Sequence, residues 1–439
     1  MSVSSPNPKK NQELQVITFG CRLNTYESEV MRQHAQSQGL QNTIIVNTCA
    51  VTNEAERQGR QAIRRIKREN PEAFMIVTGC GAQMNPTSYA GMPEVDRVLG
   101  NQEKMLESSF APDNPEAVQV TDIMMARETS HHLMSGFENR ARAFIEIQNG
   151  CNHRCTFCTI PYGRGNNRSA PLARIVEQVR TLVDHGCKEV VFTGVDITDY
   201  GKDLPGQPSL GQMIRRVLAQ VPELPRLRLS SIDPAELDQE VMHLIAEEPR
   251  LMPHFHISLQ AGDDMILKRM KRRHLRHHII DFCAQVRQLR PDVVFGADII
   301  AGFPTETDAM FENTVELVQD CQLTYLHVFP YSKRTGTPAA RMPQVEGAII
   351  KERAMRLREV GQKALQAFLA SQVGQARFVL TERHNKGHTE HFAPVWMEGG
   401  TKDNPAVEPG HIIRVRVTGV KEKKLIVTRE EECAVGLAV

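Results

Sequence analysis

The sequence predicts an α/β protein built from three consecutive parts, and three patterns along its 439 residues support this prediction. Apolar runs of strand length alternate with helical stretches over residues 12–112, and such an alternation repeats six times over residues 137–368. Polar and apolar residues then alternate with a period of two over residues 375–430, within a third part expected over residues 370–434. We therefore expect a small parallel α/β domain with flavodoxin-like winding, a partial (β/α)6 barrel and a small antiparallel β-barrel.

The first part is expected to form a parallel sheet in which each strand leads into a cysteine. The expected strands are residues 14–19, 43–47 and 73–78, with helices over residues 26–38 and 54–69. Cys21, Cys49 and Cys80 follow these strands directly. Because the carboxyl ends of parallel strands share one edge, the three thiols should meet there and hold a metal cluster. The alternative is that the three cysteines are ordinary buried packing residues. Residues 111–140 are weakly patterned and are expected to be a connector.

The second part contains six candidate strands with helices between them, two repeats short of a complete eight-stranded barrel. The strands are expected at residues 144–148, 189–194, 226–230, 254–259, 293–300 and 323–329. The helices are expected near residues 172–185, 209–220, 235–246, 276–290 and 307–320, and one charged helix follows over 347–370. Barrels of this kind place their chemistry at the C-terminal ends of the strands.

Three further cysteines, Cys151, Cys155 and Cys158, lie on one short loop directly after the first of these strands. Three thiols at this spacing cannot form unstrained disulfides without leaving one over, so metal binding is favoured. A structural zinc site needs four protein ligands, and no fourth cysteine or well-spaced histidine stands nearby. A [4Fe-4S] cluster tolerates three thiolates and leaves one iron open for a small molecule. A structural metal knuckle is the alternative.

Composition limits the remaining possibilities. Ten cysteines without a secretory signal indicate a reducing compartment, and we expect a cytoplasmic protein. No apolar stretch approaches the ~20 residues that span a bilayer, so no membrane partner is expected. The net charge of +1 gives no overall attraction to nucleic acid, and any such partner must bind to local basic patches.

Three local sequences carry a resemblance to a known family. The segments Gly20-Cys21-Arg-Leu-Asn24-Thr-Tyr26-Glu27-Ser28-Glu29, Asn47-Thr48-Cys49-Ala-Val51 and Thr78-Gly79-Cys80-Gly-Ala-Gln83 resemble the N-terminal domain of the methylthiotransferases. Gly150-Cys151 to Cys158-Thr-Ile-Pro161-Tyr162-Gly-Arg164-Gly165, with Arg168-Ser169, resembles their radical S-adenosylmethionine (SAM) core. The third part resembles TRAM, a small RNA-binding β-barrel, so the family's segments occur in the family's order over nearly the whole chain.

The resemblance implies a function and two [4Fe-4S] clusters. Cys151, Cys155 and Cys158 would hold the cluster that cleaves SAM reductively, and Cys21, Cys49 and Cys80 would hold an auxiliary cluster that carries or donates sulfur. The segment over residues 20–28 and the later Arg334-Thr-Gly-Thr-Pro-Ala-Ala look most like one branch of the family. That branch adds a methylthio group to C2 of N6-threonylcarbamoyladenosine at position 37 of tRNA. An external electron donor is also implied.

The SAM pocket is expected at the polar strand ends of the barrel, where Gly194, Ser231, Gln260 and Asp298 could bind the ribose and the methionine ammonium. Capping and turn formation by the same residues is the alternative.

Basic patches indicate where RNA could bind. Arg57, Arg60, Arg64 and Arg68 recur at helical spacing and form one face, which could contact phosphates or be merely solvated. Lys271, Arg272 and Arg273 belong to a dense basic run that favours RNA or SAM contacts. Arg414 and Arg416 in the third part fit backbone binding. The expected partner is the anticodon loop of tRNA with position 37 splayed out, and a monomer is expected.

Three alternatives remain open. Two are enzymes: one modifies isopentenyladenosine at position 37 of tRNA, and the other modifies an aspartate of a ribosomal protein and leaves tRNA unchanged. The third is a non-catalytic RNA-binding iron–sulfur redox sensor, which would not cleave SAM and which leaves two three-thiolate sites unexplained.

Overall fold

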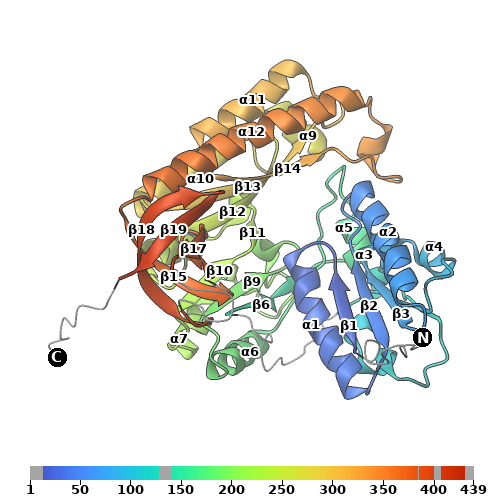
Figure 1. Cartoon of the computed structure of the whole chain (residues 1–439). Helices are drawn as coiled ribbons and strands as arrows, with labels where there is room; N and C mark the ends of the chain where they lie inside the picture. Colours follow the sequence, from blue (N-terminus) through green and yellow to red (C-terminus); the bar gives the residue numbers. More distant parts are fainter. Residues whose placement is uncertain (1–12, 128–140, 384, 400–406, 431–439) are drawn as a thin grey trace, which may run out of the picture.

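A computed structural model describes residues 13–127, 141–383, 385–399 and 407–430, and the chain forms three parts in the expected order (Figure 1). Residue 12, residues 137–140 and residues 431–434 of the expected domains lie outside the described residues. None of the helices within the described part of the chain combines the length and the apolar character needed to cross a membrane.

The N-terminal part is a five-stranded parallel sheet with helices on both faces. Its strands are β1 (Gln15–Thr18), β2 (Thr43–Thr48), β3 (Phe74–Gly79), β4 (Arg97–Leu99) and β5 (Val118–Gln119). Its helices are α1 (Arg22–Ser37), α2 (Asn53–Glu69), α3 (Cys80–Met84) and α4 (Pro86–Ala90). Successive residues of β2 point to opposite faces, so Ile45 packs with α1 while Ile44 and Val46 pack with α2.

Two features of this sheet differ from the prediction. The strand order is β1-β2-β3-β4-β5, whereas flavodoxin-like winding has the order 2-1-3-4-5. β1 is therefore an edge strand, and its exposed Gln15 and Thr18 suit that position. β5 also lies inside the segment that we expected to be a connector, because a strand of two residues is too short to show periodicity.

The central part is an open arc of parallel strands with helices outside. The strands are β6 (Arg142–Glu146), β9 (Glu189–Thr193), β10 (Arg226–Leu229), β11 (Ser231–Ile232), β12 (His254–Gln260), β13 (Val294–Ala301) and β14 (Tyr325–Pro330). The helices are α6 (Leu172–Asp184), α7 (Leu210–Gln220), α8 (Gln239–Glu247), α9 (Asp264–Met270), α10 (Arg276–Leu289) and α11 (Asp308–Asp320). All six predicted strands are present. Successive side chains of each strand point to opposite faces of the arc. In β12, Phe255, Ile257 and Leu259 therefore join the core beneath the helices, and the residues between them face the inside of the arc.

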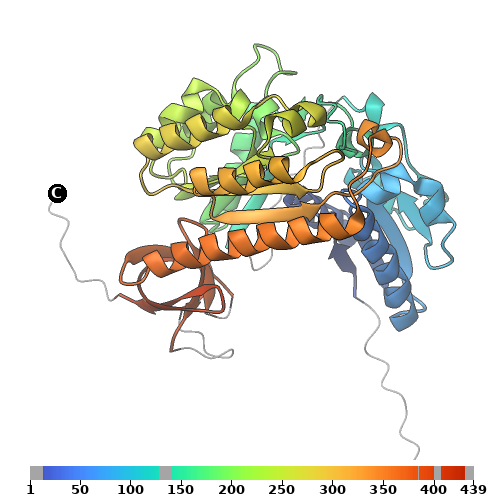
Figure 2. The ribbon, with the colours of Figure 1, turned by 90° about the horizontal axis from the view of Figure 1, so that it is seen from above.

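A long helix, α12 (Gly347–Ser371), packs along β14 and leads to the third part (Figure 2). That part is a closed five-stranded barrel in the order β15-β16-β17-β19-β18. Its strands are β15 (Ala376–Arg383), β16 (Lys386–Thr389), β17 (Pro394–Met397), β18 (Ile412–Lys421) and β19 (Lys424–Arg429). The antiparallel prediction fails for one pair, since β17 and β19 run parallel. Strand direction cannot alternate all the way around a ring of five, so one parallel pair is unavoidable.

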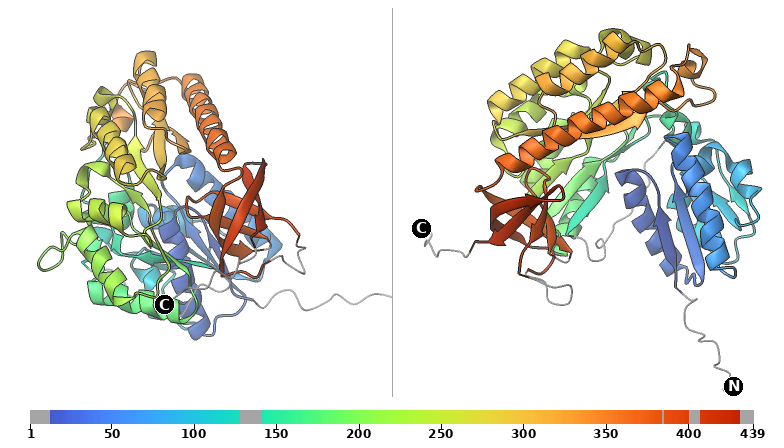
Figure 3. Two further views of the ribbon diagram at one scale, coloured as in Figure 1. Left: turned by 90° about the vertical axis from the view of Figure 1, so that its left-hand side faces the viewer. Right: turned by 45° about the horizontal axis from the view of Figure 1, so that its top comes forward.

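The outer parts both contact the central arc, as Figure 3 shows from two directions. Phe392 of the small barrel stacks on His254, the first residue of β12, with ring centroids 5.4 Å apart. Arg228 of β10 donates hydrogen bonds to the carbonyl oxygens of Thr389 and Glu390, each at 2.9 Å. The small barrel therefore packs against the N-terminal end of the arc, opposite the end where the strands lead into the cysteine loop.

Candidate active site

The first cysteine group lies on the loop between β7 (Gln148–Asn149) and the short helix α5 (Ile160–Arg164), and we call it the loop site (Cys151, Cys155 and Cys158). Donors already point at all three sulfur atoms. The backbone N–H groups of His153 and Ile160 donate to Sγ of Cys151 and Cys158, each at 3.4 Å, and Nη1 of Arg272 lies 3.7 Å from Sγ of Cys155. Such donors stabilise thiolates bound to a cluster.

The loop site fits an iron–sulfur cluster better than a single ion. Tetrahedral zinc with Zn–S bonds of about 2.3 Å holds its thiolates about 4 Å apart. Across the described residues, the three loop cysteines do not form a group with all ligand atoms within 4.8 Å of one another. Burial raises the pKa of Cys151 and of Cys158 to about 12. These buried thiols need a bound cation to become thiolates, which a cluster supplies.

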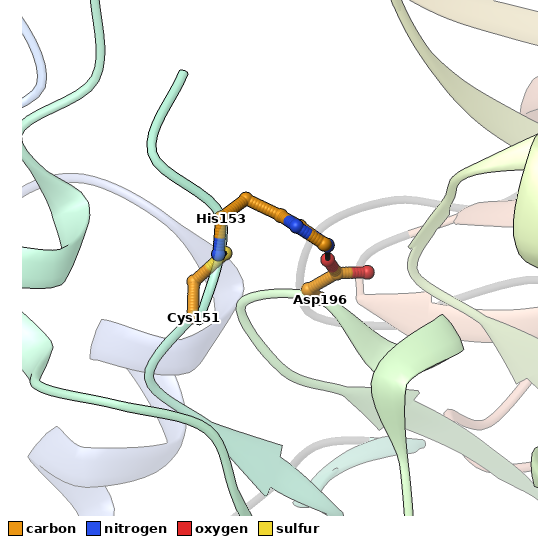
Figure 4. A group of neighbouring side chains, drawn as sticks. All are labelled: Cys151, His153 and Asp196. Carbon is orange, nitrogen blue, oxygen red and sulfur yellow. Dashed lines mark hydrogen bonds and ion pairs between the residues drawn. The ribbon is translucent and has the colours of Figure 1, made fainter. Parts of the chain in front are cut away.

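His153 does not complete a four-ligand site. Figure 4 shows its imidazole extending towards Asp196, and its Nε2 lies 2.9 Å from the Asp196 carboxylate and 3.5 Å from that of Asp199. The side chain is thus held by carboxylates that follow β9. The structural knuckle is disfavoured by this arrangement.

The second group, which we call the sheet-edge site (Cys21, Cys49 and Cys80), lies at the carboxyl ends of β1, β2 and β3 as predicted. Two glycines allow the backbone segments that carry these cysteines to pack closely against one another. Gly20 has a φ of +100°, and a Cβ there would lie 3.1 Å from Sγ of Cys49. Gly79 has a φ of +95°, and a Cβ there would lie 2.3 Å from the carbonyl oxygen of Thr48. Burial, with smaller contributions from Cys80 and Cys21, raises the pKa of Cys49 to about 11. Three neighbouring thiols, of which Cys49 is buried and Cys21 is exposed, also fit a metal cluster that one side can reach.

The helix α5 contacts both cysteine sites. It begins two residues after Cys158, and near its end a Cβ on Gly163 would lie 3.4 Å from Cβ of Cys80. The side-chain amide of Asn101 donates to the carbonyl oxygen of Gly163 at 2.5 Å and lies 3.7 Å from Sγ of Cys80. Five helical residues span about 7–8 Å, so the two sites are close neighbours.

A buried ionic network fixes this junction. Arg164, the last residue of α5, reaches Glu27 of α1 at 2.8 and 3.2 Å and Oδ1 of Asn24 at 2.6 Å. Lys104 approaches the same Glu27 carboxylate at 2.6 Å, and the three side chains are no more than 3% exposed. Burial opposes ionisation of Glu27, but Arg164 and Lys104 outweigh it and lower its pKa to about 2. Asn24 also accepts a hydrogen bond from Sγ of Cys21 at 3.6 Å, so the network extends to the sheet-edge site.

The four residues predicted to contact SAM differ in their position and in their hydrogen-bond partners. Gly194, Ser231 and Gln260 lie at or just beyond strand ends on the side of the loop site, and Gln260 has a φ of +73°. Asp298 lies within β13, and its Oδ1 accepts from His256 at 2.9 Å and from His327 at 3.2 Å. It is already bound by protein groups and is therefore the weakest of the four.

The basic residues predicted for RNA divide into two kinds. On α2, Arg57, Arg64 and Arg68 are exposed, while Arg60 is half-buried with its guanidinium 5.2 Å from the ring of Tyr89. On the small barrel, Arg414 and Arg416 are about half exposed, and both pair with Glu430.

The central basic run lies partly at the surface and partly inside the protein. Lys271 is exposed, but Arg272 donates to Asp233 and to the carbonyl oxygen of Ser258, both at 2.8 Å, besides its contact with Cys155. Arg273 pairs with Glu236. Of the two contacts predicted for this run, RNA or SAM, the position of Arg272 disfavours the RNA contact, because its guanidinium faces the loop site.

Sequence reasoning missed the buried set of Glu27, Arg164 and Lys104. Glu27 and Arg164 stand within the quoted motif segments, but nothing in the sequence indicates that they pair with each other.

Comparisons with known proteins agree with this arrangement. Two family models match: one is described as the Radical SAM superfamily, over residues 145–318, and one as an uncharacterized protein family, UPF0004, over residues 13–100. The threonylcarbamoyladenosine tRNA methylthiotransferase MtaB of Rickettsia prowazekii is 55% identical over 414 residues, which cover 94% of this chain and 97% of that protein. MtaB of Bacillus subtilis is 34% identical, with 91% and 92% covered.

A tRNA-2-methylthio-N(6)-dimethylallyladenosine synthase of Cereibacter sphaeroides is 32% identical, with 93% of this chain and 96% of that protein covered. Among solved structures, the radical SAM methyltransferase TsrM of Kitasatospora setae has a similar fold. It matches with a TM-score of 0.53 and 14% identity over 74% of each chain.

Proposed function

Because this chain belongs to the radical SAM methylthiotransferase family, together with the MtaB proteins, we propose that it methylthiolates C2 of N6-threonylcarbamoyladenosine at position 37 of tRNA. The observation that carries the proposal is the pair of three-thiol sites joined by α5. The identity of 55% with an MtaB, against 32% with a dimethylallyladenosine synthase, favours the threonylcarbamoyl substrate.

Membership of the radical SAM family implies a [4Fe-4S] cluster and SAM. We assign Cys151, Cys155 and Cys158 to that cluster, and Cys21, Cys49 and Cys80 to a second [4Fe-4S] cluster. When bound, the loop-site cluster supplies an electron to SAM, and the sheet-edge cluster supplies sulfur. Gly194, Ser231 and Gln260 border the loop site and are proposed to contact SAM.

The chain's own residues hold the two sites in one arrangement. Arg272 places its guanidinium against Cys155 and is anchored by Asp233, so it stabilises negative charge at the loop site. Arg164 joins α5 to α1 through Glu27, and it thereby fixes the sheet-edge site relative to the loop site.

The remaining assignments follow from a tRNA substrate. We propose that the exposed arginines of α2 and the small barrel contact tRNA phosphates, and that an external protein supplies electrons. A monomeric protein located in the cytoplasm with its tRNA substrate is expected.

Nucleoside mass spectrometry of total tRNA, from cells with and without the gene, tests the function. Loss of methylthio-threonylcarbamoyladenosine, with accumulation of the nucleoside that lacks the methylthio group, is the expected result. Loss of the methylthio form of isopentenyladenosine instead would reassign the substrate. Unchanged tRNA would refute a tRNA substrate and direct the search to ribosomal protein.

Two variants test the division of labour between the cysteine sites. Cys155→Ala should abolish SAM cleavage by the reduced, reconstituted protein, whereas Cys80→Ala should retain cleavage and lose methylthiolation. Methylthiolation by the Cys80 variant would contradict the assignment of the sheet-edge site.

A further inference from the structure

Arg22 lies in the junction of all three parts and forms no ion pair with any of the described residues. It follows Cys21 of the sheet-edge site and is the first residue of α1. Its guanidinium lies 5.6 Å from the ring centroid of Phe392, which belongs to the small barrel and closes the N-terminal end of the arc. Arg22 is only partly exposed, and no hydrogen bond or ion pair joins it to any residue that the structure describes.

The other charged groups around Arg22 are matched. Two more guanidinium groups, those of Arg142 and Arg228, lie 4.9 and 5.2 Å from the same Phe392 ring, and both pair with Glu189. Arg142 also pairs with Glu382 at 3.0 Å. Among the carboxylates that the structure describes, Arg142 and Arg228 each have a paired partner and Arg22 has none.

The second carboxylate near Arg22 is also engaged. Asp298 accepts hydrogen bonds from His256 and His327, as described above. Arg142 and Arg228 repel the Arg22 guanidinium, and the two carboxylates that attract it, Asp298 and Glu189, are both engaged by other residues. A guanidinium kept in such surroundings without a partner is suited to a ligand that brings a negative charge.

We propose that Arg22 binds the carboxylate of the threonylcarbamoyl group on the substrate nucleoside and thereby selects this nucleoside. The inference rests on the proposed function and specifies how its substrate is distinguished. The threonylcarbamoyl group carries the only negative charge on the modified base, whereas an isopentenyl group carries none. Arg22 adjoins Cys21 of the sheet-edge site in sequence, and its guanidinium extends to Phe392 and towards Asp298 of β13, so it can hold the side chain of a base whose ring lies near the sheet-edge site.

A backbone phosphate of the tRNA is a second source of negative charge, and the test separates the two. Full-length protein with both clusters reconstituted is titrated with two anticodon stem-loops that differ only at position 37. One carries N6-threonylcarbamoyladenosine and the other carries adenosine, and the ratio of their Kd values measures recognition of the side chain.

Three substitutions are compared with the wild-type protein. Arg22→Gln removes the charge, Arg22→Lys keeps it, and Arg32→Gln removes a charge from the same helix roughly 15 Å further along. The loss of a charged hydrogen bond corresponds to about a 10- to 100-fold loss of affinity. We expect Arg22→Gln to reduce the preference for the modified stem-loop by about that factor, with adenosine binding unchanged. Arg22→Lys should retain most of the preference, and Arg32→Gln all of it.

Equal weakening of both stem-loops would assign Arg22 to a phosphate and overturn the proposal, as would an unchanged ratio. Because Arg22 adjoins a cluster ligand, iron content and the visible absorbance of each variant are measured alongside. A third stem-loop, with the threonylcarbamoyl carboxylate converted to its methyl ester, makes the same test on wild-type protein. Undiminished binding of the ester would overturn the proposal independently of any variant. If the wild-type protein binds the modified stem-loop but does not methylthiolate it, the proposed function fails. In that case the Kd ratios still test whether Arg22 binds the threonylcarbamoyl carboxylate.

Discussion

Substitution of Glu27 by glutamine tests whether charge balance holds the junction between α5 and α1. The Glu27 carboxylate is the common partner of Arg164 and Lys104, and all three side chains are buried. Glu27→Gln would leave two buried cations without a counter-ion. Breaking a buried pair in this way costs about 3–5 kcal/mol, and here two pairs are lost.

The contrast with Arg164→Gln is the informative part. That substitution leaves the Glu27–Lys104 pair intact and neutral, so the loss is limited to the charged hydrogen bonds that Arg164 donates to Glu27, Asn24 and Asn149. Such bonds contribute roughly 1.5–3 kcal/mol. The free energy of unfolding should therefore fall more in Glu27→Gln than in Arg164→Gln, although arginine is the larger side chain.

Scanning calorimetry measures the difference, with the transition of the N-terminal part assigned by hydrogen exchange in β2 and β3. At about 4–8 °C per kcal/mol for a part of this size, Glu27→Gln should lower that transition by at least roughly 12 °C. Glu54→Gln, which breaks an exposed pair with Arg57, is the matched control and should change little. An Arg164→Gln variant that unfolds at or below the temperature of Glu27→Gln would refute the reasoning.

Three further results are expected. Because the folded-state pKa of Glu27 is about 2 against an ordinary 4.5, its stabilisation is complete above about pH 4.5, and the Tm gap between wild type and Glu27→Gln should shrink as the pH falls towards 2. Gly79→Ala places a Cβ against the Thr48 carbonyl and should remove about half of the bound iron, measured per protein after reconstitution, while SAM cleavage persists. Neutralising Arg64 and Arg68 together should weaken tRNA binding and flatten its dependence on salt; an unchanged slope would leave this face merely solvated.

The sequence was a good guide to individual elements and to the cysteine sites. The six strands of the arc appear within a few residues of their predicted bounds, because each shows either an apolar run or an apolar–polar alternation of strand length. The common edge of Cys21, Cys49 and Cys80 could also be predicted, because each follows the end of a strand and the prediction requires only that these strands run parallel.

Local sequence patterns could not predict which strands and which side chains are neighbours in the fold. The order of β1 and β2 depends on which edge each strand occupies, and the parallel pair of β17 and β19 depends on closure of the ring. Glu27 and Arg164 are separated by 137 residues, so no periodicity links them. The inward position of Arg272 could not be predicted for a related reason: a dense basic run does not show which of its members a distant carboxylate engages.

The number of residues in the short helix α5 sets the distance between the two cysteine sites. Each residue in a helix advances the chain by about 1.5 Å and rotates it by about 100°. One residue added between Cys158 and Gly163 would swing Gly163 off Cys80 and carry Arg164 away from Glu27 in the same step. A longer or a shorter α5 could therefore not keep both the contact of Gly163 with Cys80 and the pairing of Arg164 with Glu27.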